Sequence, residues 1–445
     1  MAGRCGPAVA HDIEDAMKLK PVKGMQDILP EEVRRWQVVE ERFRRAVELH
    51  GFAEVRTPLL EATELFQRST GETTEVVEKQ MFTLERGSES LSLRPEGTPS
   101  SARAYIHESV YAKQPVSRWY YLGPMFRAEQ PQRGRQRQFH QAGCEIYGDA
   151  GPLCDAELID MLYGLLSELG VAGLKVSVNS LGGSESRARY RDALIAYFEP
   201  HASALSSHAQ ERFRQNPLRV LDSKDERDRS VAKGAPSILD LLTDEDRAHW
   251  QGLLAALDAL GTPYEIDEQL VRGLDYYTRT TFEISTTTGA IGSQNALLGG
   301  GRYDDMIAGL GGPATPAIGF AMGLERVLLA LGDFAVPARP WVALAPLGPA
   351  QQNPALTLAK SLRQQGFTAE VDGRGTSLKS MLRRANAGGA RFCVVIGEAE
   401  LAGGVVQLKD LALHAQEEVP FTALAERLAA RLTSSPMSPE SEDRG

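Results

Sequence analysis

Residues 117–148, SRWYYLGPMFRAEQPQRGRQRQFHQAGCEIYG, decide the fold of this chain. Side chains of a strand alternate between two faces, so odd and even positions separate. The even positions predict a core face, formed by Tyr120, Leu122, Phe126, Ala128, Ala142, Cys144 and Ile146. The odd positions predict a binding floor, formed by Arg127, Glu129, Phe139, Gln141, Gly143, Glu145 and Tyr147. The stretch therefore predicts a long antiparallel hairpin.

The segment that joins the two strands, residues 130–138, reads QPQRGRQRQ, and its Pro131 and Gly134 suit a loop. Guanidinium groups are planar forks of donors that match phosphate oxygens. The arginines of the hairpin therefore predict a polyanionic partner, and they are Arg127, Arg133, Arg135 and Arg137. Phe139 offers a flat surface for a base, and Glu145 an acceptor for an N–H group. The alternative interpretation is an exposed basic hairpin that only binds RNA.

Composition sets the broad class. The 445 residues are enough for two or three domains, and 42% are hydrophobic. The net charge of −10 confines any polyanion site to a local basic patch. The four cysteines form no C-x-x-C pair, which predicts reduced thiols, no zinc site and a cytoplasmic protein. No segment has the ~20 apolar residues that span a bilayer.

Three further segments combine chemistry-bearing residues. In residues 92–99, SLRPEGTP, Thr98 and Pro99 suit a helix start, but this role leaves Arg94, Glu96 and Gly97 unexplained. Residues 270–277, LVRGLDYY, contain Arg272, Tyr276 and Tyr277; packing alone is the other interpretation of the tyrosines. Residues 317–329, AIGFAMGLERVLL, predict a strand, a glycine turn and a helix that carries Arg326, unless that arginine is a salt-bridged structural residue. Residues 298–304, LGGGRYD, predict a glycine-rich turn.

Changes in charge, turn residues and hydrophobic pattern along the chain predict several parts. Residues 1–20 form an N-terminal extension, residues 21–181 and 263–335 one domain, and residues 182–262 a helical insertion. Residues 340–432 predict a β-α-β-α-β domain with a largely parallel sheet. Residues 433–445 are rich in Ser, Pro and Glu and predict a disordered tail. An amphipathic helix over residues 31–50 precedes a strand over residues 52–60 that Pro58 interrupts.

The hairpin motifs Phe126-Arg127-Ala128-Glu129 and Phe139-His-Gln141-x-Gly143-x-Glu145 resemble motif 2 of class II aminoacyl-tRNA synthetases, in the form of the histidyl-tRNA synthetase family. The helix before Pro58 is similar to motif 1 and residues 317–329 to motif 3. The resemblance implies an α+β catalytic domain on a mainly antiparallel sheet, with a helical insertion and a C-terminal α/β domain like those that bind anticodons. It also implies a homodimer.

The resemblance implies roles for single residues. Histidine would be bound by Glu96, Gly97, Thr98, Arg127, Gln141, Glu145, Arg272, Tyr276 and Tyr277. ATP would be bound by Arg127, Glu129, Arg135, Phe139 and Arg326, and catalysis would fall to Arg127, Arg272 and Arg326 with Mg²⁺. No metal site built by the protein is expected. The partners would be histidine tRNA, L-histidine and ATP, with no membrane.

The function expected from this resemblance is ligation of histidine to its tRNA through histidyl-adenylate. Three alternatives stay open. One is a non-catalytic subunit similar to the synthetase-like regulatory subunit of ATP phosphoribosyltransferase, and another is a class II synthetase for a different amino acid. The third is a protein that binds RNA and never consumes ATP.

Overall fold

A computed structural model describes residues 19–433 except 71–73, 75, 222, 224, 271–275, 289–294, 335 and 337–340. Most of the predicted extension and tail, and Arg272 with its neighbours, therefore lie outside the described residues. The chain divides into two compact units, Met1–Phe334 and Ala335–Gly445. In the described part, no helix combines the length and the apolar character needed to cross a membrane.

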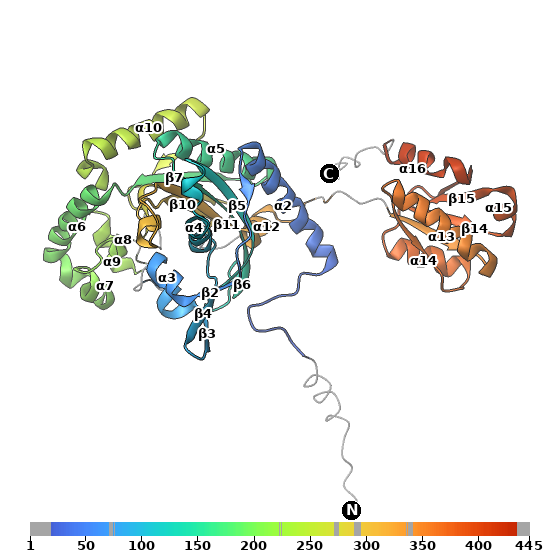
Figure 1. The fold of residues 1–445 in the computed structure, drawn as a ribbon, viewed down its shortest axis with the longest axis horizontal. Coiled ribbons are helices and arrows are strands. Elements are labelled where there is room, and N and C mark those ends of the chain that lie inside the picture. The colour runs from blue at the N-terminus through green and yellow to red at the C-terminus, as the bar shows by residue number, and fades with distance from the viewer. Residues whose placement is uncertain are drawn as a thin grey trace, which may run out of the picture. The chain divides into compact units, whose positions relative to one another are not determined.

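The first unit is built on an eight-stranded sheet, in the order β1-β5-β6-β11-β10-β9-β7-β8 (Figure 1). Its strands are β1 (Ala53–Glu54), β5 (Ser117–Phe126), β6 (Gln138–Tyr147), β11 (Ala317–Gly323), β10 (Ala296–Arg302), β9 (Thr278–Thr286), β7 (Leu174–Ser180) and β8 (Glu265–Ile266). The six inner strands pair antiparallel, and only the short edge strands β1 and β8 pair parallel. The predicted hairpin is β5 and β6, and the mainly antiparallel sheet is confirmed.

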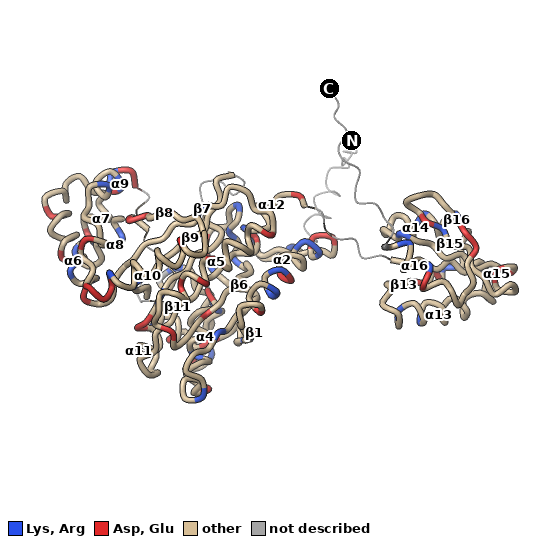
Figure 2. The backbone as a smooth tube through the Cα atoms, turned by 90° about the horizontal axis from the view of Figure 1, so that it is seen from above, with Lys and Arg blue, Asp and Glu red and all other residues tan. Residues whose placement is uncertain are grey.

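The even face of the hairpin packs against a helical layer. The helices of this layer are α2 (Pro30–Leu49), α5 (Pro152–Leu169), α10 (Asp244–Leu260) and α12 (Leu324–Leu331). Tyr120, Ala142, Cys144 and Ile146 are buried in this core, and Leu122 packs against it, as the alternation predicted. Figure 1 shows α5 and α10 side by side. In Figure 2, acidic and basic residues alternate along α2, which suits a helix with one solvated face.

The odd face of the hairpin carries a smaller core under α4 (Thr98–His107) and α11 (Met306–Gly309). There Tyr105 stacks on Tyr147, with ring centroids 4.4 Å apart. Beside it lie α3 (Thr63–Thr70), η1 (Val76–Gln80), η2 (Val110–Ala112) and a three-stranded sheet of β2 (Leu60–Ala62), β4 (Glu89–Leu93) and β3 (Phe82–Arg86). The sequence predicted a single strand that Pro58 interrupts. Instead, Pro58 lies between two strands, β1 and β2, which belong to different sheets.

The glycine run 299–301 is not a turn, in contrast to the prediction. It lies inside β10 and pairs with β9 and β11. A Cβ on Gly300 would meet the Gly319 backbone oxygen at 2.3 Å, and one on Gly301 would meet the Thr280 backbone oxygen at 2.5 Å. These glycines therefore allow neighbouring strands to approach, which is a use of glycine that a sequence motif does not separate from a turn.

In the described part of residues 184–260, every element of regular secondary structure is a helix. The helices are α6 (Ser184–Phe198), η3 (Glu199–Ala204), α7 (Ser207–Arg212), α8 (Leu218–Leu221), α9 (Glu226–Ala232), η4 (Ile238–Leu241) and α10. Their buried side chains, such as Leu194 and Phe198, join the same apolar cluster as the sheet. That this region is a separate inserted domain stays a prediction.

The second unit is an α/β domain with a five-stranded sheet in the order β13-β12-β14-β15-β16. Its strands are β12 (Trp341–Pro346), β13 (Thr368–Val371), β14 (Phe392–Ile396), β15 (Val405–Asp410) and β16 (Ala415–Pro420). Its helices are α13 (Pro349–Gln364), α14 (Leu378–Ala387), α15 (Glu398–Gly403), η5 (Phe421–Ala423) and α16 (Leu424–Thr433). The first three strands are parallel, as predicted; β15 and β16 add an antiparallel extension that the sequence reading missed.

Candidate active site

The tip of the hairpin is a small folded loop. Gln132 and Arg135 exchange two backbone hydrogen bonds, of 3.0 and 2.9 Å. Gly134 has a φ of 74°, a left-handed conformation that glycine adopts without strain. At the base of the loop, the backbone nitrogen of Arg137 donates to the Gly24 oxygen over 2.7 Å. The basic loop is thus held in a definite place beside the sheet.

Glu145 is the most enclosed acid of the odd face, with 0% exposure. Its Oε1 accepts hydrogen bonds from the Thr98 hydroxyl at 2.7 Å and from the Tyr121 hydroxyl at 3.1 Å. Its Oε2 accepts a hydrogen bond from Tyr303. Burial raises the pKa of Glu145 to about 8, although the three hydroxyl groups oppose this shift. The shift arises mainly because burial dehydrates the carboxylate while no cation among the described residues pairs with it.

Glu96 lies on the segment that connects β4 to α4, and it is 3% exposed. It accepts a hydrogen bond from the Thr70 hydroxyl at 3.2 Å. Burial raises the pKa of Glu96, against the opposing effects of the Arg127 charge and of hydrogen bonds from Thr70 and Tyr276. The negative charge of Glu96 in turn raises the pKa of Glu145. The two acids therefore share one enclosed region.

Gly143, on the predicted binding floor, leaves space that a side chain of the neighbouring strand occupies. A Cβ on Gly143 would lie 2.5 Å from the Tyr121 ring, and a Cβ on Gly97 would lie 2.1 Å from the same ring. Tyr121 is therefore clamped between two glycines. Gly319 on β11 has a related use, because its Cβ would meet Glu145 Oε2 at 1.8 Å.

Gln141 faces the same region from β6 and is 8% exposed. Its side-chain oxygen is buried and makes no hydrogen bond with any described residue. Buried polar atoms of folded proteins usually have a partner, so this oxygen points to a missing donor. A ligand that carries an N–H or ammonium group would supply one.

A group of arginines lies at the nucleotide end predicted for the site. Arg127 donates through Nε to the Pro95 oxygen at 3.0 Å, and its guanidinium lies 5.3 Å from the centre of the Phe139 ring. Arg135 forms an ion pair of 3.1 Å with Glu129. Arg326, at the start of α12, donates to the Gly134 oxygen at 3.2 Å and to the Ala296 oxygen at 2.8 Å.

The electrostatics connect these arginines to one another. Burial lowers the pKa of Arg326, and the positive charges of Arg135 and Arg127 lower it further. The charges of Glu129 and Glu283 partly oppose this effect, and an anion bound beside the arginines would oppose it further. Arg127 also acts on Glu96, so the arginines and the acids belong to one connected site.

Of the site residues predicted from the sequence, the structure brings together Glu96, Gly97, Thr98, Arg127, Glu129, Arg135, Phe139, Gln141, Glu145 and Arg326. Tyr276 and Tyr277 lie next to each other at the same end, with ring centroids 4.6 Å apart, and Tyr276 contacts Tyr303. Arg272 lies outside the described residues. The individual roles of these residues stay predictions.

Sequence reasoning missed two residues that contact Glu145, namely Tyr121 and Tyr303. The sequence position of each tyrosine indicated that it could face Glu145. Tyr121 is an odd position of the hairpin, opposite Gly143 in register. Tyr303 follows the glycine run that was interpreted as a turn. A bulky aromatic residue opposite a glycine on a paired strand indicates that the ring lies over that glycine.

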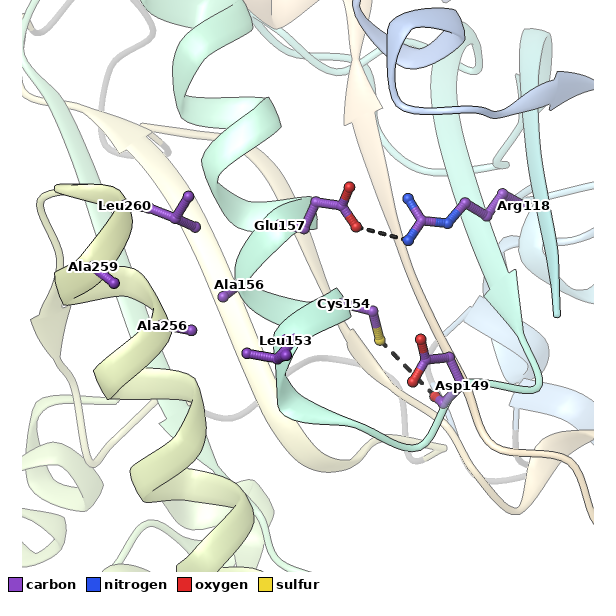
Figure 3. Close-up of a pocket in the computed structure, with 9 residues that line it drawn as sticks. All are labelled: Arg118, Asp149, Leu153, Cys154, Ala156, Glu157, Ala256, Ala259 and Leu260. Carbon is purple, nitrogen blue, oxygen red and sulfur yellow. Dashed lines mark hydrogen bonds and ion pairs between the residues drawn. The ribbon is translucent and has the colours of Figure 1, made fainter.

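A separate cavity of about 410 Å³ lies between α5 and α10 (Figure 3). None of the predicted site residues lines it. Its floor is mainly alanine and leucine, and an ion pair of 2.7 Å between Arg118 and Glu157 lies at its edge. This cavity lacks the clustered cations and acids of the region around Glu96 and Arg127.

Metal-ligating side chains do not gather into a cluster within the described residues. No cluster of three or more His, Cys, Asp or Glu side chains there is arranged to hold a metal ion. Two carboxylates, Glu129 and Glu283, act electrostatically on Arg326. Mg²⁺ is commonly bound by one or two carboxylates together with the phosphates of a nucleotide, and these residues fit that arrangement.

Comparisons with known proteins agree with this geometry. The family model of histidyl-tRNA synthetase matches residues 24–327, and a model described as anticodon binding domain matches residues 341–431. A histidine–tRNA ligase of Sorangium cellulosum is 57% identical over 420 residues, which are 94% of this chain and 98% of the relative. One of Geobacter sulfurreducens is 46% identical over 93% of this chain and 99% of the relative.

Solved structures give the same result. The crystal structure of apo S. aureus histidyl-tRNA synthetase has a TM-score of 0.78 and 34% identity, over 92% of this chain and 99% of that one. A Bacillus halodurans structure described as an ATP phosphoribosyltransferase regulatory subunit/histidyl-tRNA synthetase has a TM-score of 0.63 over 86% of this chain and 98% of that one; its 24% identity indicates the fold alone. From the family matches and the identities together, this chain belongs to the histidyl-tRNA synthetase family.

Proposed function

We propose that the chain is a histidine–tRNA ligase, which activates L-histidine with ATP and transfers it to the 3′ end of its tRNA. The observation that carries the proposal is one connected site on the odd face of the sheet. At one end of this site lie buried acids that form no ion pair within the described part of the chain, and clustered arginines lie at the other. An amino acid with a basic side chain suits the first end, and a nucleotide triphosphate suits the second.

At the amino-acid end, Glu96 accepts from the α-ammonium group of histidine. Thr98 already donates its proton to Glu145, so its oxygen is left to act as an acceptor for the same ammonium group. Glu145 accepts from an N–H of the imidazole, and Gln141 supplies the acceptor that has no described partner. Tyr276 and Tyr277 close this end. Arg127, with Arg272, attracts the carboxylate and turns it toward the phosphates.

At the nucleotide end, Phe139 offers a ring to the adenine base, while Arg127, Arg135 and Arg326 attract the phosphates. Glu129 holds Arg135 in place through their ion pair. The reaction is a displacement at the α-phosphorus by the histidine carboxylate, which releases pyrophosphate. It requires little acid–base chemistry from the protein, so positioning and neutralisation of phosphate charge dominate. Mg²⁺, held by Glu129 or Glu283 with the phosphates, would neutralise further charge.

The other features of the proposal follow from the family. Transfer of histidine to tRNA involves the second unit, whose sequence matches the anticodon binding domain model. A homodimer is proposed because residues 31–60 resemble motif 1 of the class. A cytoplasmic location agrees with the use of ATP and tRNA and with three buried free cysteines among the described residues.

The alternative of a non-catalytic regulatory subunit has less support. Such a protein is expected to lose the histidine-site residues and the C-terminal domain, and both are present in this sequence. The relatives at 57% and 46% identity, which this chain matches over 98% and 99% of their length, are described as histidine–tRNA ligases.

The test is ATP–pyrophosphate exchange with each of the twenty amino acids in turn. Histidine alone is expected to support exchange, and Arg272→Ala is expected to remove it. Exchange with a different amino acid instead of histidine would favour the alternative of a class II synthetase for that amino acid. Absence of exchange with every amino acid, in a folded protein that binds tRNA, would favour the RNA-binding or regulatory alternatives.

A further inference from the structure

Glu145 has a definite number of acceptor positions, and most of them are filled. An ionised carboxylate offers about four lone-pair positions, two on each oxygen. In the described part of the chain, Oε1 receives two donors, from Thr98 and Tyr121, and Oε2 receives one, from Tyr303. One position on Oε2 is therefore left for a ligand.

We propose that Tyr121 and Tyr303 are positioning residues of the histidine site, which together with Thr98 fill three acceptor positions of Glu145 and leave one that takes a single N–H of the imidazole. This inference rests on the proposed function, because it assigns the ligand of Glu145 as histidine. It adds to that function a reason for selectivity. The carboxylate has one free acceptor position, so it accepts one donor from one direction and does not act as a general anionic surface.

Both tyrosines are held on rigid parts of the sheet. The Tyr121 ring lies between Gly97 and Gly143, where any Cβ would collide with it. The backbone nitrogen of Tyr303 donates to the Ala317 oxygen at 2.9 Å. The residue before Tyr303 is Arg302, which is buried and ion-paired with Asp155 at 2.7 Å. Neither hydroxyl can follow a carboxylate that moves, so together they fix its orientation.

Gly319 completes the arrangement on the remaining side. Because a Cβ at this position would lie 1.8 Å from Oε2, only glycine leaves the space that this oxygen occupies. The side chain of Glu145 is thus restricted by hydroxyl groups from β5, α4 and the end of β10 and by the backbone of β11. A single orientation of the carboxylate follows from these contacts.

The groups that face Glu145 determine how it titrates. Glu96 adds negative charge from the segment before α4 and raises its pKa. Tyr121, Tyr303, Tyr276 and Tyr147 are neutral near pH 8, since burial raises the pKa of each well above that of an ordinary phenol. The hydroxyl groups of Tyr121 and Tyr303, like that of Thr98, stabilise the ionised form of Glu145, and loss of any one of them raises its pKa.

The experiment compares Tyr121→Phe and Tyr303→Phe with Tyr120→Phe in histidine-dependent ATP–pyrophosphate exchange. Tyr120 is the matched control: it lies on the same strand, faces the other core, and donates its hydroxyl to Glu48 at 2.9 Å. Each test variant keeps the ring and removes one donor. The KM for histidine is expected to rise about tenfold in each test variant, with the KM for ATP within about twofold of the wild type.

The pH profile gives a readout that a merely structural role would not move. Activity needs the ionised carboxylate and is lost as pH falls through its pKa, so a raised pKa moves the acid limb of kcat/KM to higher pH. This shift is expected for Tyr121→Phe and Tyr303→Phe and not for Tyr120→Phe. Neither KM nor the position of the limb depends on the folded fraction, so a less stable variant still gives an answer.

A double-mutant cycle tests whether Tyr303 acts through Glu145. In a Glu145→Gln background, Tyr303→Phe is expected to change the KM for histidine less than twofold. An undiminished tenfold effect there, or test variants that match Tyr120→Phe in both KM and pH profile, would overturn the inference while the proposed function stands. Wild-type protein without histidine-dependent exchange would instead overturn the proposed function.

Discussion

Asp155 and Glu145 are both fully buried acids of the first unit, yet their partners differ in charge. Asp155 accepts from the Arg302 guanidinium at 2.7 and 3.0 Å and from the Thr280 hydroxyl at 2.6 Å. Glu145 accepts from hydroxyl groups only, among the described residues. Burial raises the pKa of both acids, but a positive charge opposes this shift at Asp155, whereas only neutral donors oppose it at Glu145.

This difference separates a structural acid from one kept for a ligand. Arg302 also donates to the backbone oxygens of Asp149 at 2.8 Å and Gly151 at 2.7 Å, so its pair with Asp155 joins β10 to the start of α5. Such a site is complete without any further molecule. The carboxylate of Glu145 is held in one orientation, but no cation among the described residues forms an ion pair with it. This arrangement is expected where the ligand supplies the remaining donor.

The largest effect is expected from breaking the complete pair. Arg302→Met leaves Asp155 buried without the guanidinium that pairs with it. The free energy of unfolding, measured by urea denaturation, is expected to fall by about 3–5 kcal/mol. Arg118→Met is the control, because its 2.7 Å pair with Glu157 is 25% and 43% exposed and should contribute only about 0–1 kcal/mol. Similar losses in the two variants would contradict the distinction between the buried and the exposed pair.

The second prediction concerns the incomplete site. Glu145→Gln removes the charge and keeps the shape, so kcat/KM for histidine in pyrophosphate exchange is expected to fall about 100-fold. The free energy of unfolding should change by less than about 1.5 kcal/mol, because relief from burying a carboxylate is offset by the amide nitrogen, which cannot accept a hydrogen bond from a hydroxyl group. A variant that unfolds as easily as Arg302→Met yet exchanges at a normal rate would make Glu145 a structural acid.

The third prediction uses the coupling between the two acids of the site. Glu96→Gln removes a negative charge that raises the pKa of Glu145. The acid limb of kcat/KM should therefore move to lower pH, opposite to the shift expected for Tyr303→Phe, while the KM for histidine rises about tenfold through loss of the ammonium contact. Glu157→Gln, away from the site, is the control. A limb that does not move would show that Glu96 and Glu145 titrate independently.

The fourth prediction concerns His249, which lies 3.5 Å from Asp155 and is 8% exposed. Burial, with the charges of Arg302 and Arg279, lowers its pKa to about 4. The unfolded state therefore binds a proton below about pH 6.5 that the native state does not. As pH falls between these two values, the free energy of unfolding decreases by about 1.4 kcal/mol per pH unit. His249→Gln should flatten this slope in unfolding experiments at pH 7.5, 5.5 and 4.5. An unchanged slope would assign the dependence to other groups.

Much of the fold could be predicted from the sequence because the hairpin alternates so regularly. On the even face, Tyr120, Ala142, Cys144 and Ile146 are buried in the main core, as period-two patterning predicted, and Leu122 packs against it. The odd face is enclosed as well, because Tyr147 belongs to a second, smaller core. The glycine run 299–301 could not be placed, because a glycine that admits a neighbouring strand and one that forms a turn look alike in sequence. The strands β15 and β16 were missed because their alternation is short and charged.

The candidate site was predictable to the extent that it depends on motifs. Glu96, Arg127, Glu145 and Arg326 were selected through resemblance, and the structure places them in one region. Tyr121 and Tyr303 were not selected, because their roles depend on which strand lies opposite which. Pairing of Tyr121 with Gly143 across the hairpin is a matter of register, and register appears only once the strands are assembled.

The most direct test of the distinction between the two acids is the number of protons released when histidine binds at pH 8. Calorimetric titration in buffers of different ionisation enthalpy measures this number. With a pKa of about 8 in the free protein, Glu145 is half protonated at this pH, and binding to an N–H donor should release about half a proton. Glu145→Gln should lack this release. Equal proton release by both proteins would contradict the claim that this buried acid is kept ionisable for the ligand.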